Sequence, residues 1–210
     1  SGMRLNSGAG KIAMCPLKWL QSKLRDSIGM KGMGMQQVRW GIIGCGNVTE
    51  LKSGPAFNKV ADSALVAVMR RDAAKAEDYA KRHQVPRWYS DAQQLINDPE
   101  VDAVYIATPP DSHKDYALLV AAAGKICCVE KPMALNTAQC IEMTEAFERK
   151  QLPLYVSYYR RSLPRFLKIK EWLEQELIGT PRQVQWSFSR TPNTVDLAGH
   201  YNWRTDPSKA

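Results

Sequence analysis

The sequence has few of the residues that build metal sites and disulfide frameworks. It contains three histidines and five cysteines among its 210 residues, and no pair of cysteines follows the C-x-x-C spacing. An odd number of cysteines without such spacing does not support a disulfide framework, and scattered histidines do not support a zinc site. We therefore predict a reduced, cytoplasmic protein that binds no metal.

Long apolar runs are missing too, and acidic residues are outnumbered. No stretch approaches the ~18–20 apolar residues that a membrane helix requires, so no membrane partner is expected. Lys and Arg total 29 against 21 Asp and Glu, a net charge of +8, of which residues 1–36 contribute +5. The rest of the chain is close to balanced and has no RNA-binding or recognition-helix motif, so nucleic acid is not an expected partner.

The pattern of apolar residues divides the chain into three parts. Residues 1–36 hold six of the 13 glycines and five of the eight methionines, and we interpret them as a flexible leader or extension. From Val38, short apolar runs alternate with longer helical stretches, which is the βαβ pattern. Strands are predicted at 38–43, 64–69, 101–106, 126–129 and 154–158, and helices at 47–59, 72–82, 90–96, 111–123 and 136–149. Pro55 marks a bend or a late start in the first of these helices. Because these runs are apolar on both faces, we predict an α/β fold, a Rossmann-type doubly wound parallel sheet, over residues 37–155.

The rhythm changes after Tyr158. A helix is predicted over 163–177 with Gly179 as its stop, and residues 182–189 alternate between polar and apolar, which is typical of a half-exposed strand. We assign residues 156–210 to the beginning of a second, open-sheet α+β domain. These residues are too few for a comfortable independent core, so we expect that domain to be incomplete.

A glycine-rich turn joins the first predicted strand to the first predicted helix. Gly44 permits a tight turn, and Gly46 lets the backbone approach a pyrophosphate that the N–H groups at the start of the helix can bind. Thr49 stands where the third glycine of the motif would be. Since this strand-turn-helix context is what the motif requires, we predict a dinucleotide site. Its residues here are Gly44, Cys45, Gly46, Asn47 and Val48.

The end of the second predicted strand indicates which dinucleotide is bound. An acid is usual there, because it accepts a hydrogen bond from the 2′-hydroxyl of NAD. This chain has Arg70 and Arg71 instead, and a guanidinium suits a 2′-phosphate or stacks on adenine. The charge therefore favours NADP over NAD. Asp72 keeps NAD open, and two solvated arginines at a strand end are the structural alternative.

Three motifs that follow successive strands together resemble the Gfo/Idh/MocA oxidoreductase family. They are Gly44-Cys45-Gly46-Asn47, then Ala107-Thr108-Pro109-Pro110 with His113, then Glu130-Lys131-Pro132-Met133-Ala134. The resemblance implies a Rossmann domain that binds NAD or NADP. It also implies a C-terminal domain that covers the nicotinamide and often forms the dimer contact, so a homo-oligomer is expected if that domain is complete.

The resemblance assigns roles to individual residues. Lys131 is expected beside the nicotinamide and the substrate as the catalytic residue, where a lysine in a dry cleft can donate a proton to a carbonyl oxygen as hydride arrives. Thr108 and Pro109 are expected to line the nicotinamide side, and Glu130 to orient the loop or the cofactor ribose. For His113, packing on its helix is favoured over a contact with the cofactor.

The predicted function is hydride transfer between NADP, or NAD, and a hydroxyl or carbonyl carbon of a sugar, polyol or related small molecule. The near edge of the substrate site is predicted at Lys131, Arg161, Trp203 and Arg204, and Pro132 is a candidate cis proline. Related enzymes pair the lysine with a histidine downstream of the Trp-Arg segment, and the sequence stops at Ala210 before such a residue. The alternative is a nucleotide-binding sensor or interaction protein without catalysis.

Overall fold

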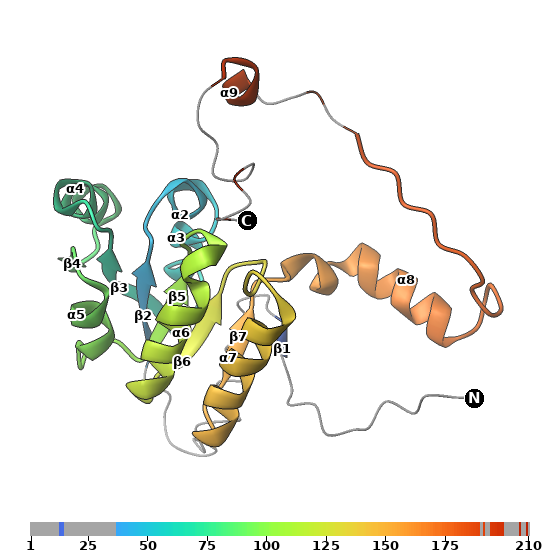
Figure 1. The fold of residues 1–210 in the computed structure, drawn as a ribbon, viewed down its shortest axis with the longest axis horizontal. Coiled ribbons are helices and arrows are strands. Elements are labelled where there is room, and N and C mark those ends of the chain that lie inside the picture. Colours follow the sequence, from blue (N-terminus) through green and yellow to red (C-terminus); the bar gives the residue numbers. More distant parts are fainter. Residues whose placement is uncertain are drawn as a thin grey trace.

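The predicted doubly wound sheet is confirmed. The computed structural model describes residues 13–14, 37–189, 191, 194–199, 206 and 209. Within them, seven strands form one parallel sheet in the order β1-β7-β6-β5-β2-β3-β4 (Figure 1). The strands are β1 (Ala13–Met14), β2 (Val38–Ile43), β3 (Ser63–Met69), β4 (Arg87–Tyr89), β5 (Ala103–Ile106), β6 (Ile126–Val129) and β7 (Leu154–Val156). The chain order reverses at β2, which pairs with β3 on one side and β5 on the other.

Helices cover both faces of this sheet and enclose two apolar cores. The α-helices are α2 (Asn47–Leu51), α3 (Gly54–Phe57), α4 (Ala73–His83), α5 (Ala92–Asn97), α6 (His113–Ala122), α7 (Thr137–Arg149), α8 (Pro164–Glu174) and α9 (Thr194–Leu197), and the 3-10 turns are η1 (Pro110–Ser112) and η2 (Tyr159–Ser162). Ile43 and Ile106 pack with α5, α6 and α7, whereas Trp40 and Ile42 pack with α3 and α4 on the opposite face. Because successive strand residues alternate between faces, each buried strand contributes to both cores.

Three helices begin where a short polar side chain accepts one of the first free N–H groups. Asp72 and Asn136 accept from the third residue of α4 and α7, at 3.2 and 3.0 Å, as their predicted helix starts require. The helix predicted to start at Ser90 begins later, because Asp91 rather than Ser90 is its cap and accepts from Gln94 N at 3.1 Å.

One other predicted helix boundary was wrong. Asp111 does not start α6, because it lies inside η1, where the hydroxyl of Ser112 bonds Pro109 O at 3.0 Å and tightens the turn. The interruption predicted at Pro55 is confirmed: residues 47–59 are divided into α2 and α3, since Pro55 at the start of α3 has no N–H for an unbroken helix. Strand β4 was missed because three residues carry too little pattern.

The region after Tyr158 departs most from expectation. Helix α8 confirms the centre of the predicted helix, and it extends away from the sheet (Figure 1). Residues 182–189 form no strand, so that prediction was wrong, because no described strand lies beside them to complete a ladder. Their apolar side chains are exposed, with Trp186 at 76%. Two residues of the predicted leader, Ala13 and Met14, pair with β7.

None of the helices in the described ranges combines the length and the apolar character that spanning a bilayer would need.

Candidate functional site

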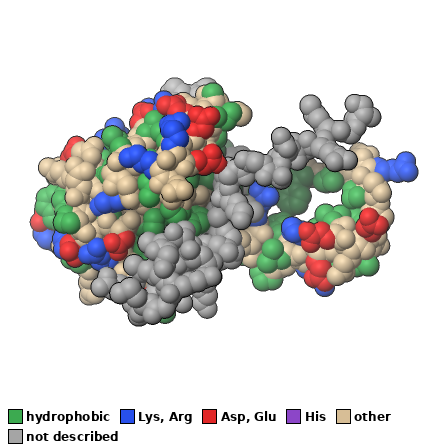
Figure 2. Space-filling view, turned by 90° about the horizontal axis from the view of Figure 1, so that it is seen from below, with side chains coloured by type: hydrophobic (Ala, Val, Ile, Leu, Met, Phe, Trp, Pro, Cys, Tyr) green, Lys and Arg blue, Asp and Glu red, His purple; other side chains and the backbone are tan. Residues whose placement is uncertain are grey.

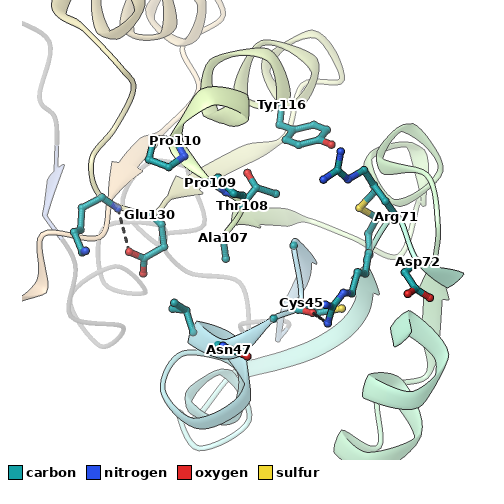
Figure 3. A pocket seen from close by; sticks show the side chains of 16 residues that line it. Cys45, Asn47, Arg71, Asp72, Ala107, Thr108, Pro109, Pro110, Tyr116 and Glu130 are labelled. Carbon is teal, nitrogen blue, oxygen red and sulfur yellow. Dashed lines mark hydrogen bonds between the residues drawn. The ribbon is translucent and has the colours of Figure 1, made fainter. Parts of the chain in front are cut away.

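A pocket of about 520 Å³ lies at the carboxyl ends of β2, β3, β5 and β6 (Figure 3). The segments that follow these four strands line it, which is where a doubly wound sheet binds ligands. Eleven of the twelve predicted cofactor residues are among its lining: Gly44, Cys45, Gly46, Asn47, Val48, Arg70, Arg71, Thr108, Pro109, Glu130 and Lys131. Glu130 lies at one end of the pocket and Arg71 at the other, with Thr108 between them.

The turn after β2 requires glycine at Gly44. Its φ is +92°, and a Cβ there would lie 2.7 Å from Thr108 Cγ2 and 2.9 Å from Thr108 N. Gly44 N also donates to Met69 O at 2.9 Å, which holds the turn between β3 and β5. A Cβ on Gly46 would have its nearest neighbour 3.9 Å away, so Gly46 leaves open space rather than filling a tight contact.

Thr49, at the third position of the glycine motif, completes the turn with its hydroxyl. It is fully buried, and its Oγ1 accepts from Gly46 N at 2.9 Å and donates to Gly46 O at 2.8 Å. Gly46 N is therefore occupied within the protein. The first N–H groups of a helix have no intrahelical partner, which leaves those of Asn47 and Val48 for a ligand in the pocket they line.

Charged side chains gather at the end of the pocket that follows β3. Arg70 lies against the glycine turn, since its Nη1 donates to Cys45 O at 3.3 Å. Asp72 is engaged by Lys75, whose backbone N donates to it and whose Nζ lies 2.9 Å from its carboxylate. The side-chain hydrogen bond from Lys75 lowers the pKa of Asp72. This end of the pocket therefore carries two arginines and one carboxylate already paired within α4.

The surroundings of Cys45 do not support a redox role for its thiol. Its side chain is fully buried, and burial raises the pKa of the thiol to about 11. The group is a neutral thiol near pH 7, so it acts as a small apolar side chain in the turn.

His113 is the predicted cofactor residue that does not line the pocket. It is fully buried at the start of α6, with Nδ1 2.9 Å from Pro132 O and Nε2 2.8 Å from Thr108 O. Carbonyl oxygens only accept, so both contacts are hydrogen bonds when both ring nitrogens carry a proton. His113 joins two segments that flank the pocket, in agreement with the favoured packing role.

The Glu130-Lys131-Pro132 segment follows β6 at the other end of the pocket. The Lys131–Pro132 peptide is cis, as expected. Glu130 Oε1 accepts from the hydroxyl of Tyr105 at 2.5 Å. Its Oε2 accepts from Lys131 N at 3.0 Å (Figure 3). The Lys131 side chain is exposed and lines the pocket, so its amine can meet a ligand.

Sequence reasoning missed Tyr105 and Tyr116. Tyr116 comes from α6 and lines the pocket, while Tyr105 sits within an apolar strand, where only its hydroxyl distinguished it from the core. Of the predicted substrate residues, Arg161 lies exposed in η2 and is not part of the pocket lining. Trp203 and Arg204 lie outside the described residues.

Comparison with known proteins identifies the fold and its relatives. A family model described as the oxidoreductase family with an NAD-binding Rossmann fold, GFO_IDH_MocA, matches residues 38–158. An NAD-binding oxidoreductase from Klebsiella pneumoniae shares 29% identity and a TM-score of 0.60, over 68% of this chain and 40% of that one. The WlbA dehydrogenase of Bordetella pertussis, solved with NADH and UDP-GlcNAcA, shares 26% identity and a TM-score of 0.65, over 70% and 42%.

Two curated relatives are similar over a larger share of the sequence. Oxidoreductase P35 of Formosa agariphila is 48% identical over 172 residues, which cover 81% of this chain and 54% of that protein. The trans-1,2-dihydrobenzene-1,2-diol dehydrogenase of Sus scrofa is 34% identical, over 77% of this chain and 50% of its own length. The chain therefore spans about half the length of the curated relatives it matches.

Proposed function

The chain belongs to the Gfo/Idh/MocA oxidoreductase family, and we propose that it carries the cofactor site of an NADP-dependent oxidoreductase. The reaction is hydride transfer between the nicotinamide and a hydroxyl or carbonyl carbon of a sugar, polyol or related small molecule. One observation carries the proposal: a single pocket is lined by the glycine turn, by Arg70 and Arg71, and by Glu130 and Lys131.

The pocket suits a nicotinamide dinucleotide in size and in chemistry. Its volume of about 520 Å³ lies inside the roughly 300–1,000 Å³ range of ligand sites. The side-chain-free surface at Gly46 and the N–H groups of Asn47 and Val48 would hold the pyrophosphate. When bound, the nicotinamide supplies the hydride chemistry.

The charges at the β3 end support NADP over NAD. Arg70 and Arg71 offer two guanidinium groups to a 2′-phosphate. Asp72, the carboxylate that could accept from the ribose of NAD, is already bound by Lys75 in two ways. The Bordetella relative was solved with NADH at 26% identity, so NAD is the competing cofactor to test.

Lys131 is our candidate for the group that moves a proton. It stands next to Glu130 in the pocket, and its amine can donate to the oxygen of a substrate carbonyl as the carbon is reduced, or receive the proton of a hydroxyl when the reaction runs in reverse. The Sus scrofa relative is named for the oxidation of a cyclic vicinal diol, which supports diols and polyols as the substrate class.

The rest of the substrate site is proposed from the region after β7. We assign residues 156–210 to the start of the C-terminal domain, with Arg161, Trp203 and Arg204 as candidate substrate contacts. A homo-oligomer formed through that domain and a cytoplasmic location belong to the same proposal.

The first test is a binding titration of the 210-residue chain with NADPH and with NADH. We expect NADPH to bind at least tenfold more tightly, and Arg70→Ala to remove most of that preference while NADH affinity changes little. Arg165→Ala is the control, because Arg165 is an exposed arginine of α8 that is not part of the pocket lining.

The other outcomes of this titration would each overturn a different part of the proposed function. Tenfold tighter NADH would overturn the NADP assignment, and binding of neither nucleotide would overturn the cofactor site. Tight binding without turnover of sugars, polyols or dihydrodiols would favour a nucleotide sensor instead of an enzyme.

A further inference from the structure

Tyr105 holds a fixed position beneath the pocket. It lies in the middle of β5, where it pairs with Ile42 of β2 and Cys128 of β6, and only 3% of it is exposed. Its ring packs on Phe57 with centroids 5.4 Å apart, and Phe57 packs on Trp40 at 4.9 Å. Neighbouring strands on both sides and an aromatic cluster thus fix the direction of its hydroxyl.

That hydroxyl points at one oxygen of Glu130. The Tyr105 hydroxyl donates to Glu130 Oε1 at 2.5 Å, while Glu130 Oε2 accepts from Lys131 N at 3.0 Å. One donor is the rigid phenol, and the other is the backbone of the candidate proton-transfer residue. A carboxylate oxygen can accept about two hydrogen bonds, so each oxygen keeps capacity for a hydroxyl of a ligand in the pocket.

The same hydroxyl is linked to the other side of the pocket through Ser53. The Ser53 side chain hydrogen-bonds the Tyr105 hydroxyl, and its Oγ also lies 3.3 Å from Val48 O. Val48 lies in the first turn of α2, directly after the glycine turn, and lines the pocket. Ser53 has one hydroxyl proton, which it donates either to Val48 O or to the Tyr105 hydroxyl.

The phenol is a permanent donor in this arrangement. Burial, and then the charge of Glu130, raise the pKa of Tyr105 far above its usual value. It therefore keeps its proton across the working pH range and remains a donor to Glu130 Oε1.

We infer that Tyr105 is a positioning residue for the reaction: its hydroxyl fixes the Glu130 carboxylate, and with it the Lys131 backbone, in the orientation that receives a ligand hydroxyl. This inference rests on the proposed function. Without the phenol, Glu130 would keep a single anchor, the N–H of its own neighbour, and would turn between rotamers, so ligand binding would have to order it.

The test is a double-mutant cycle read out as NADPH affinity. Tyr105→Phe keeps the ring and its packing but removes the donor, and we expect it to weaken NADPH binding about tenfold. In a Glu130→Ala background the same change should alter affinity less than twofold, because the group through which Tyr105 acts is gone. Where turnover is measurable, kcat is expected to fall as well.

Tyr89→Phe is the matched control. It removes another phenol-to-carboxylate hydrogen bond, from Tyr89 to Asp98 Oδ2 at 3.0 Å, and neither side chain lines the pocket. We expect a comparable change in melting temperature from Tyr89→Phe but no change in NADPH affinity. Equal affinity effects of the two variants would mean that Tyr105 acts only through stability, and would overturn the inference.

Two further outcomes keep this inference separate from the proposed function. If the unaltered chain binds no NADPH, the proposed function fails first. If it binds NADPH and Tyr105→Phe binds equally well, only the positioning role fails. Should Tyr105→Phe not fold, Glu130→Asp replaces it: the shorter side chain keeps the charge but withdraws the carboxylate from the phenol, and unchanged affinity would again overturn the inference.

Discussion

Two regions of this chain are equally rich in large apolar side chains, yet one buries them and the other does not. In the sheet, Trp40 is fully buried between β2 and α3. After Tyr158, Trp186 is 76% exposed and Trp172 of α8 is 45% exposed. Figure 2 shows hydrophobic side chains at the surface of a part that lies apart from the main body.

The two regions differ in whether other helices or strands of the region pack over its apolar side chains. Each strand from β2 to β7 has helices on its faces, so apolar residues there find a second layer. Helix α8 carries apolar side chains one turn apart, such as Ile169 and Leu173, but no described element covers them. An apolar pattern thus predicts the type of an element, whereas its burial depends on what packs against it.

The largest expected effect comes from truncating one tryptophan in each region. Trp40→Ala removes a fully buried ring and should cost about 3–5 kcal/mol of unfolding free energy. Trp186→Ala should change it by less than about 0.5 kcal/mol, because the ring meets mostly solvent. Urea unfolding of both variants measures the contrast. A similar cost for both would mean that residues 182–189 are packed in solution.

A second contrast compares two glycines with positive φ. Gly44→Ala has both a strained φ of +92° and a Cβ 2.9 Å from backbone, and we expect a cost of about 2–4 kcal/mol with loss of NADPH binding. Gly179→Ala has a φ of +65° and nothing within 4 Å, so only the strain of roughly 1 kcal/mol applies. Gly46→Ala, which meets open space, separates the two effects: stability should hold while NADPH affinity falls.

Much of the fold could be predicted from the sequence, because parallel strands that are buried on both faces appear in the sequence as continuous apolar runs. Strands 38–43 and 126–129 were predicted at the observed boundaries. Predicted helix boundaries were wrong where two adjacent residues can both cap a helix, as Ser90 and Asp91 can at the start of α5. The strand expected at 182–189 failed because a ladder depends on a neighbouring strand, about which local alternation says nothing.

The site could be predicted to a similar degree, for a topological reason. Segments that follow parallel strands meet at one edge of the sheet, so motifs far apart in the sequence arrive together in the pocket. Tyr105 and His113 were harder, because the direction of a buried hydroxyl or imidazole depends on packing. His113 was expected to pack, and the structure adds which two carbonyls it joins.

The smallest expected effect compares an ion network beside the glycine turn with an ion pair on α8. Arg82 binds both oxygens of Glu50 at 2.8 and 2.9 Å, and His83 Nε2 lies 2.7 Å from the same carboxylate. These contacts tie α4 to α2. On α8, the Lys170–Glu174 pair is exposed on both sides. We expect Glu50→Gln to cost about 1–2 kcal/mol at pH 7, and Glu174→Gln less than about 0.5 kcal/mol.

The pH dependence distinguishes the two carboxylates further. Hydrogen bonds from Arg82, and then from His83, lower the pKa of Glu50 from 4.5 to about 2. Because the folded state holds the proton less tightly than the unfolded state, this stabilisation is complete above about pH 4.5 and is lost as the pH falls toward 2. The stability difference between the unaltered chain and Glu50→Gln should therefore shrink over that range in denaturant titrations. A difference that stays constant across it would mean that Glu50 contributes by packing rather than by charge, and the network would then resemble the exposed pair of α8.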